Sequence, residues 1–161
     1  MKSNRMEIVF DAIPENEGLA RVVASAFVLG LNPTLEQLCD IKTAVSEAVT
    51  NCIIHGYEGR RGKITMRCVL EECEFRVEIE DQGIGIDDVG TAMEPLYTSK
   101  PDDDRSGMGF SFMEAFMDEL KVESKPGKGT KVIMKKMIEK GEQRESYERR
   151  DEEFAMCGKS W

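Results

Sequence analysis

The chain has 161 residues and a mass of 18.1 kDa, close to the usual size of one globular domain. Its 22 basic and 31 acidic residues give a net charge of −9, which argues against duplex DNA as the main partner because phosphate binding needs clustered Lys and Arg. The apolar runs are short, and the N-terminus lacks the apolar segment of a signal peptide. We therefore expect a cytoplasmic protein that contacts neither nucleic acid nor membrane directly.

Strand and helix patterns alternate along most of the chain. Apolar residues at every second position predict strands at 6–10, 63–70, 75–80, 121–124 and 130–137. Apolar residues three and four positions apart predict helices at 15–30, 34–55 and 110–120. The second helix begins at Thr34 and Gln37, which have the spacing of a capping box. This order of elements predicts an α+β two-layer sandwich, with a mixed, largely antiparallel sheet and helices on one face.

We expect one folded domain over residues 1–138 and a charged C-terminal tail over 139–161. The tail is rich in Glu, Arg and Lys and has few apolar residues, so it should be frayed or disordered. The polar run at 100–106 lies in an irregular stretch that is too long for an ordinary connection. We interpret that stretch as a functional loop or lid.

The second predicted helix carries Glu47, Asn51 and His55 at spacings of four residues. This spacing places side chains along one helix face, so a carboxylate and an amide oxygen can converge on one point. Oxygen ligands of this kind, completed by water and phosphate oxygens, suit Mg²⁺. A solvated helix face is the alternative interpretation.

An acidic residue, Asp81, ends a predicted strand and is followed by Gly83 and Gly85. A carboxylate at a strand end can accept a hydrogen bond from an exocyclic amine such as that of adenine, and glycines allow close backbone approach. An ordinary Asp-x-Gly turn explains the same pattern. The sequence contains neither a Rossmann fingerprint nor a P-loop.

Two glycines, Gly107 and Gly109, open the third predicted helix directly after Arg105. Free N–H groups at a helix start form a phosphate site, and an arginine can add a charged fork to a terminal phosphate. A flexible loop with glycine hinges is the alternative. The sequence Gly-Lys-Gly-Thr at 127–130 is compatible with an ordinary hairpin turn.

These four motifs, in this order, resemble the nucleotide-binding boxes of the ATP-binding superfamily shared by gyrase B subunits, heat-shock chaperones, sensor histidine kinases and mismatch-repair proteins. The resemblance spans residues 6–137. Within that superfamily the chain is most similar to the anti-sigma factors of sporulation that are serine protein kinases. The segments that carry this resemblance are ENEGLAR at 15–21, IKTAVSEAVTNCIIHGY at 41–57, PLYTSKP at 95–101 and RSGMGFSFMEAFMD at 105–118.

The resemblance implies an ATP- and Mg²⁺-dependent homodimer that binds a sigma factor of RNA polymerase and phosphorylates a serine of an anti-anti-sigma protein. Glu47 would be the general base, Arg105 would neutralise charge on the transferring phosphoryl group, and Asn51 would hold Mg²⁺. Glu17 and Arg21 match the partner-binding surface, although a surface ion pair explains them as well.

The resemblance also implies a set of nucleotide-binding positions. They are Asn51, Asp81, Gly83, Gly85, Thr98, Lys100, Ser106, Gly107, Met108, Gly109, Phe110 and Thr130. Among them, Asp81 would bind the adenine amino group, and Thr130 would support the adenine side through a water molecule. Lys100 is the weakest member of this set, because we favour a solvated lid residue over a second cation at this position.

Three other functions compete with this hypothesis. A histidine kinase catalytic domain would normally follow a helix pair with a phosphoacceptor histidine, whereas His55, the only histidine, lies within the second predicted helix. A gyrase- or chaperone-type ATPase would need transducer domains that 161 residues do not accommodate. A module that binds ATP and a sigma factor without transferring phosphate stays open.

Overall fold

The computed structural model describes residues 3–94 and 108–139. The strands of this part are β1 (Asn4–Asp11), β2 (Lys63–Glu71), β3 (Glu74–Asp81), β4 (Glu119–Lys125) and β5 (Gly129–Met137). The α-helices are α1 (Glu15–Val28), α2 (Leu35–Asn51), α3 (Val89–Ala92) and α4 (Gly109–Phe116). A 3₁₀ turn, η1 (Leu29–Leu31), follows α1, and a π-helical turn, η2 (Cys52–Gly56), continues α2.

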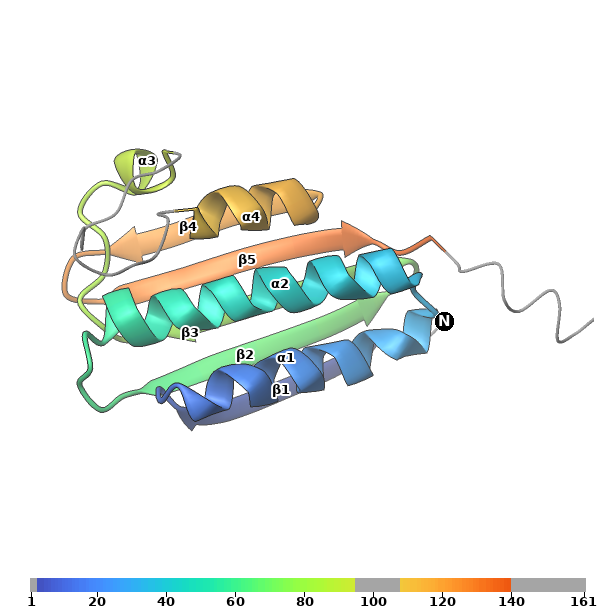
Figure 1. Cartoon of the computed structure of the whole chain (residues 1–161), viewed down its shortest axis with the longest axis horizontal. Coiled ribbons are helices and arrows are strands. Elements are labelled where there is room, and N and C mark those ends of the chain that lie inside the picture. The colour runs from blue at the N-terminus through green and yellow to red at the C-terminus, as the bar shows by residue number, and fades with distance from the viewer. Residues whose placement is uncertain (1–2, 95–107, 140–161) are drawn as a thin grey trace, which may run out of the picture.

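The strands form one sheet in the order β1-β2-β3-β5-β4. Every neighbouring pair in it is antiparallel, so the described sheet contains none of the parallel pairs that a mixed sheet would have. Helices α1, α2 and α4 lie side by side on one face of the sheet (Figure 1). The expected α+β sandwich with helices on one face is therefore confirmed.

The core lies between the sheet and the helices. Every second residue of β2 and β3 points toward the helices, and these buried side chains are Ile64, Met66, Cys68, Leu70, Phe75, Val77 and Ile79. Helix α2 meets them with residues three and four apart, namely Ile41, Ala44, Val45, Ala48 and Val49. The two alanines let the α2 backbone approach the sheet closely, and the apolar area removed from water is the main stabilising contribution.

Helix α2 begins with the predicted capping box. The Gln37 N–H donates to the Thr34 hydroxyl oxygen at 3.2 Å, and the Thr34 N–H donates to the Gln37 side-chain oxygen at 3.1 Å. These two bonds satisfy backbone donors that a helix start leaves free. They anchor the first end of the helix that carries Glu47 and Asn51.

The structure corrects two predicted helix ends and adds one helix. The second helix is α-helical only to Asn51 and then becomes the π-helical turn η2. The third helix ends at Phe116, and Leu120, which its apolar spacing had assigned to the helix, is a residue of β4. The helix α3 lies in the stretch interpreted as irregular. The polar run at 100–106 and nearly all of the tail at 139–161 lie outside the described residues.

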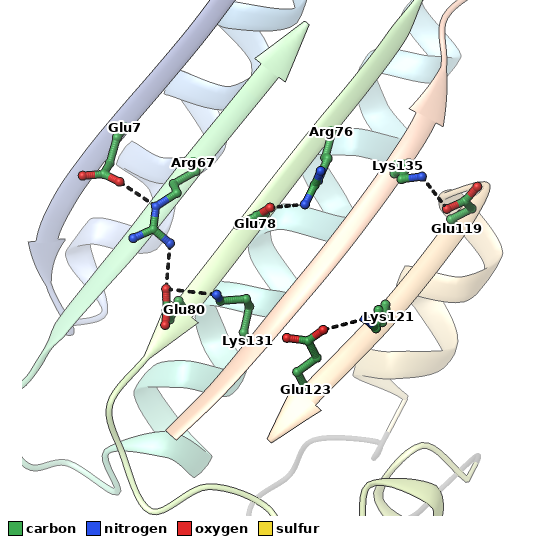
Figure 2. Close-up of polar contacts among 10 residues, drawn as sticks. All are labelled: Glu7, Arg67, Arg76, Glu78, Glu80, Glu119, Lys121, Glu123, Lys131 and Lys135. Atoms are coloured by element: carbon green, nitrogen blue, oxygen red, sulfur yellow. Dashed lines mark hydrogen bonds and ion pairs between the residues drawn. The ribbon is translucent and has the colours of Figure 1, made fainter. Parts of the chain in front are cut away.

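The face of the sheet away from the helices carries interleaved charges (Figure 2). Arg67 on β2 bonds Glu7 on β1 at 2.6 Å and Glu80 on β3 at 2.7 Å. Further pairs on this face are Arg76–Glu78, Lys121–Glu123, Lys131–Glu80 and Lys135–Glu119. Because these side chains are partly exposed, each pair contributes little to stability, and the face is that of a solvated sheet.

None of the helices in the described part of the chain is long and apolar enough to cross a membrane.

Candidate functional site

The site is built around the second half of α2, where Glu47 and Asn51 lie one turn apart and are half-buried. Helix α4 packs against α2, and its first residue, Gly109, lies directly over these two side chains. A Cβ atom on Gly109 would lie 3.1 Å from Glu47 Oε2 and 3.3 Å from Asn51 Oδ1. The structure thus brings together the helix motif and the last glycine of the segment 105–109, which are far apart in sequence.

The N-terminus of α4 therefore faces a carboxylate and an amide oxygen. Neighbouring positions Met108, the N-cap of α4, and Phe110, its second residue, are partly buried. A helix N-terminus has free N–H groups and a partial positive charge that favour an anion. The pairing of such a terminus with oxygen side chains is suited to a phosphate group accompanied by a cation.

A magnesium ion fits the donor chemistry of this place. Mg²⁺ usually takes one or two protein oxygens and completes its shell with water and phosphate oxygens. Asn51 Oδ1 is such an oxygen, and the glycine at 109 lets the first residue of α4 lie close beside it, since a Cβ atom there would be 3.3 Å from that oxygen. Among the described residues, no group of three His, Cys, Asp or Glu side chains forms an all-protein metal cage.

The second part of the site is Asp81 at the end of β3, whose side chain is only 3% exposed. Its Oδ1 accepts a hydrogen bond of 2.8 Å from the Gly83 N–H, and the Cys52 thiol donates to the same carboxylate. Burial raises the pKa of Asp81, and these hydrogen bonds oppose that rise. A buried carboxylate held in one orientation is suited to recognise a hydrogen-bond donor on a ligand.

The loop after Asp81 is held against the end of α2. The Ile84 N–H donates to the Gly56 carbonyl at 2.9 Å, and a Cβ atom on Gly83 would lie 2.0 Å from that oxygen. Gly85 has φ of +74° and lies against the Lys125 carbonyl. Backbone contacts within the protein thus require glycine at 83 and 85, independently of any contact that these residues make with a ligand.

The position Thr130 lies in β5 beside this loop. Its hydroxyl lies 2.8 Å from the Ser124 hydroxyl, which in turn accepts a 2.8 Å hydrogen bond from the Ile86 N–H. The β4–β5 pair and the loop at 83–86 are therefore joined through side-chain hydroxyls. The structure places Thr130 next to the Asp81 part of the site, and its support of an adenine base stays a prediction.

Several residues around the site were not predicted from the sequence. Cys52, 2% exposed, contacts Asp81 from the first residue of the π-helical turn, and Ser124 links Thr130 to the loop. Tyr57 contacts the residue after Asp81. The sequence did signal the burial of Cys52, because this residue continues the apolar face of the second predicted helix three positions after Val49. Its contact with Asp81 had no signal in the sequence.

Five predicted site residues lie outside the described part of the chain. They are Thr98, Lys100, Arg105, Ser106 and Gly107. The remaining pair, Glu17 and Arg21 on α1, forms an i,i+4 ion pair with 3.5 Å between Arg21 Nη1 and Glu17 Oε1. Arg21 is 45% exposed in its side chain, and the neighbouring Leu19 and Val22 on α1 are exposed apolar residues.

Comparison with known proteins adds to this geometry. The family model described as "Histidine kinase-like ATPase domain" matches residues 10–136. The protein named "Anti-sigma F factor" of Clostridium acetobutylicum is 58% identical over 136 residues, which are 84% of this chain and 95% of that relative. The chain belongs to the anti-sigma F factor family. The protein of the same name from Thermoanaerobacter sp. (strain X514) is 52% identical over 136 residues, again 84% of this chain and 95% of the relative.

Solved structures agree on the fold. The RsbU and RsbW domains of Rv1364c from Mycobacterium tuberculosis match with a TM-score of 0.60 and 18% identity, over 84% of this chain and 32% of that one. The catalytic domain of histidine kinase ThkA matches with a TM-score of 0.53 and 17% identity, over 84% of this chain and 96% of that one. At these identities the likeness shows the shared ATPase-domain fold.

Proposed function

We propose that this protein binds and inhibits a sporulation sigma factor of the sigma-F type, and that it is an ATP-dependent serine kinase that phosphorylates and inactivates its anti-anti-sigma antagonist. The names of the relatives support the first part. The observation that supports the second is the packing of Gly109 on Glu47 and Asn51, because it brings a base candidate next to the residues proposed to bind phosphate and metal. We expect the protein to act in the cytoplasm.

Asp81 would bind the adenine side of ATP. An ionised carboxylate has about four acceptor sites, so the bonds from Gly83, Cys52 and the Thr130 N–H leave capacity for the exocyclic amine. Gly83 and Thr130 lie beside this carboxylate and Gly85 lies in the loop after it, and these three residues would line the base or support it. The rigidity of this part favours a specific base, because a fixed acceptor discriminates between an amine and a carbonyl on the ligand.

Asn51 would hold Mg²⁺ together with phosphate oxygens, and the N-terminus of α4 would bind the phosphates. The remaining predicted nucleotide-binding positions are Thr98, Lys100, Ser106, Gly107, Met108 and Phe110, and of these Gly107 would hold phosphates. Bound Mg²⁺ would supply charge neutralisation at the transferring phosphoryl group. Arg105 would add a cationic donor to that group.

Glu47 would act as the general base. Its carboxylate would accept the proton of the substrate serine hydroxyl while the serine oxygen bonds to the γ-phosphorus and the bond to the ADP oxygen breaks. It lies one turn from Asn51 on the same helix, so its carboxylate is close to the proposed metal ligand. The products are a phosphoserine and ADP.

The ion pair of Glu17 and Arg21 would contact both protein partners, and we propose that the active form is a homodimer. The domain proposed for 1–138 includes the whole family match at 10–136, and the tail at 139–161 lies beyond it.

A labelled-phosphate assay tests the kinase proposal. The full-length protein, Mg²⁺, labelled ATP and a cognate anti-anti-sigma protein should give an acid-stable, base-labile phosphoserine. Glu47→Gln should keep its ADP affinity and lose transfer by about 100-fold or more, as expected when a general base is removed. Asp81→Asn should instead weaken ADP binding. Glu36→Gln, an exposed carboxylate at the start of the same helix, is the matched control and should transfer normally.

Each alternative gives a different result in this assay. Nucleotide binding by the wild type without any phosphate transfer would support the alternative of a module that binds ATP and a sigma factor without being a kinase. An acid-labile phosphate would favour the histidine-kinase-type domain. Normal transfer by Glu47→Gln would remove Glu47 as the base.

A further inference from the structure

Tyr57 is a buried tyrosine, 7% exposed, that follows the π-helical turn at the end of α2. Its hydroxyl lies between two backbone groups from different elements. It donates to the Lys63 carbonyl at 2.5 Å and accepts a 2.9 Å hydrogen bond from the Gln82 N–H. Gln82 is the residue directly after Asp81, so this phenol contacts the backbone next to the proposed adenine-binding carboxylate.

The ring is fixed as firmly as its hydroxyl. A Cβ atom on Gly62 would lie 2.1 Å from Tyr57 Cε1, so the backbone at residue 62 covers the ring face directly. At the other end, the Tyr57 N–H donates to the Cys52 carbonyl at 2.9 Å and closes the π-helical turn. The hydroxyl therefore has little freedom to follow the loop if the loop moves.

Three consecutive N–H groups of the loop after Asp81 each donate a hydrogen bond within the protein. The Gln82 N–H is bound by Tyr57, the Gly83 N–H by Asp81 itself and the Ile84 N–H by the Gly56 carbonyl. Two of these three acceptors belong to residues 56–57, at the end of the chain segment that carries Glu47 and Asn51. The adenine side of the site is thus attached to the phosphate side through this short segment.

We infer that Tyr57 is a positioning residue for nucleotide binding. Its hydroxyl holds the backbone beside Asp81 at a fixed place relative to α2, so that one ligand can meet Asp81 and the α2–α4 site together. This inference rests on the proposed nucleotide-binding function. Tyr57 itself would not contact the nucleotide, because its hydroxyl already donates to the Lys63 carbonyl and accepts from the Gln82 N–H.

The test is Tyr57→Phe in the full-length protein, with ADP and GDP as probes. The variant keeps the ring that packs against Gly62 and removes only the hydroxyl, which leaves the Gln82 N–H without its acceptor. We expect the Kd for ADP, measured by calorimetry, to rise about tenfold and the preference for ADP over GDP to fall. Tyr147→Phe, a hydroxyl deletion beyond the family match, is the control and should bind like the wild type.

The outcomes separate this inference from the proposed function. A wild type that does not bind ADP overturns both. A wild type that binds ADP, with a folded Tyr57→Phe variant of equal affinity and equal ADP preference, overturns the role of Tyr57 alone. A purely structural role would lower stability to urea and leave the ADP preference unchanged.

If Tyr57→Phe does not fold, Gln82→Pro removes the same hydrogen bond from the other partner, because proline has no N–H. It should show the same loss of ADP affinity and preference, and unchanged ADP binding by this variant would also overturn the inference.

Discussion

At the scale of single residues, Asp81 shows how the site affects stability. Burial raises the pKa of this carboxyl, because the charged form loses its hydration, and the N–H of Gly83 and the thiol of Cys52 compensate only in part. An acidic group whose pKa is higher in the folded chain than in the unfolded chain lowers the free energy of unfolding once it ionises. The carboxylate proposed for adenine recognition therefore lowers the stability of the nucleotide-free protein.

The substitution Asp81→Asn should reveal this effect as a pH dependence. Below pH 3.8, the ordinary value, the carboxyl is protonated in both the folded and the unfolded chain and has no ionisation cost. As the pH rises toward the higher pKa of the folded state, the unfolded chain ionises first, so the free energy of unfolding of the wild type falls. The amide does not titrate. We expect the stability of Asp81→Asn relative to wild type to increase from about pH 4 to pH 7.

Urea unfolding of the nucleotide-free proteins at several pH values measures this difference. A stability difference that stays constant over the whole range would contradict the assignment of the raised pKa to Asp81.

At the scale of elements, the two helices of the site are joined through Lys136 on β5. Its side chain points to the helix side of the sheet and the residue is 9% exposed. The Lys136 Nζ lies 3.1 Å from Asp40 Oδ2 on α2 and donates to the Phe116 carbonyl at 2.6 Å, at the last residue of α4. One ammonium group thus binds the helix of Glu47 and the C-terminal end of the helix that begins at Gly109.

Replacing Lys136 by Met should destabilise the protein by about 2 kcal/mol, because a mostly buried carboxylate and a helix-end carbonyl lose their partner. The neighbouring Lys135 provides a matched control, since it lies on the opposite face of β5 and pairs with the exposed Glu119. Lys135→Met should change stability by less than about 0.5 kcal/mol. Equal effects of the two substitutions on the free energy of unfolding, measured by chemical denaturation, would show that the buried ion pair stabilises the protein no more than the exposed one.

A methyl group at the start of α4 should disturb the site without unfolding the helix. In Gly109→Ala the new Cβ lies 3.1 Å from Glu47 Oε2, so the carboxylate or the helix must shift by a few tenths of an ångström. Alanine is the better helix former, and we expect stability to change little while Mg²⁺-ATP affinity falls about tenfold. Gly18→Ala is the control, because its Cβ would have only Arg21 nearby, at 3.9 Å. Calorimetric titration with Mg²⁺-ATP would contradict this expectation if Gly109→Ala bound like the control.

At the scale of the whole molecule, the proposed nucleotide-binding residues that the structure describes lie on α2, at the start of α4, at the end of β3 and the loop after it, and on β5. None of the proposed nucleotide-binding residues lies on α1, which we propose as the surface for protein contacts. It combines the half-exposed Arg21 with the exposed Leu19 and Val22, which are 49% and 61% exposed. Charged and apolar groups together on one surface are typical of the partner-binding surfaces of proteins.

Reversing the charge of Arg21 should weaken the proposed partner contact. We expect Arg21→Glu to reduce capture of the sigma factor in a pull-down by about tenfold or more while ADP binding stays normal. Arg60→Glu is the control, since Arg60 is an exposed arginine in the turn before β2. Undiminished capture by Arg21→Glu would exclude this residue from the partner surface.

The amino-acid sequence by itself determined most of the elements, the fold class and the family. Periodicity located β1, α1 and the core face of α2, because the position of an apolar residue within a repeat decides which face it joins. The capping box at Thr34 could also be located from the sequence, because its two hydrogen bonds join residues only three positions apart. Leu120 was misassigned because a helix face and the first residues of a strand can both be apolar over so short a run.

Only the tertiary structure decided which distant residues meet. Glu47 and Gly109, or Tyr57 and Gln82, are joined by contacts across more than 20 residues of sequence, which no local pattern encodes. The same holds for the burial of Asp81, since a strand-end carboxylate is exposed or buried according to what packs over it, here Gly56 and Cys52. The physical reason is that burial and convergence depend on the packing of whole elements, whereas periodicity and capping depend on neighbours along the chain.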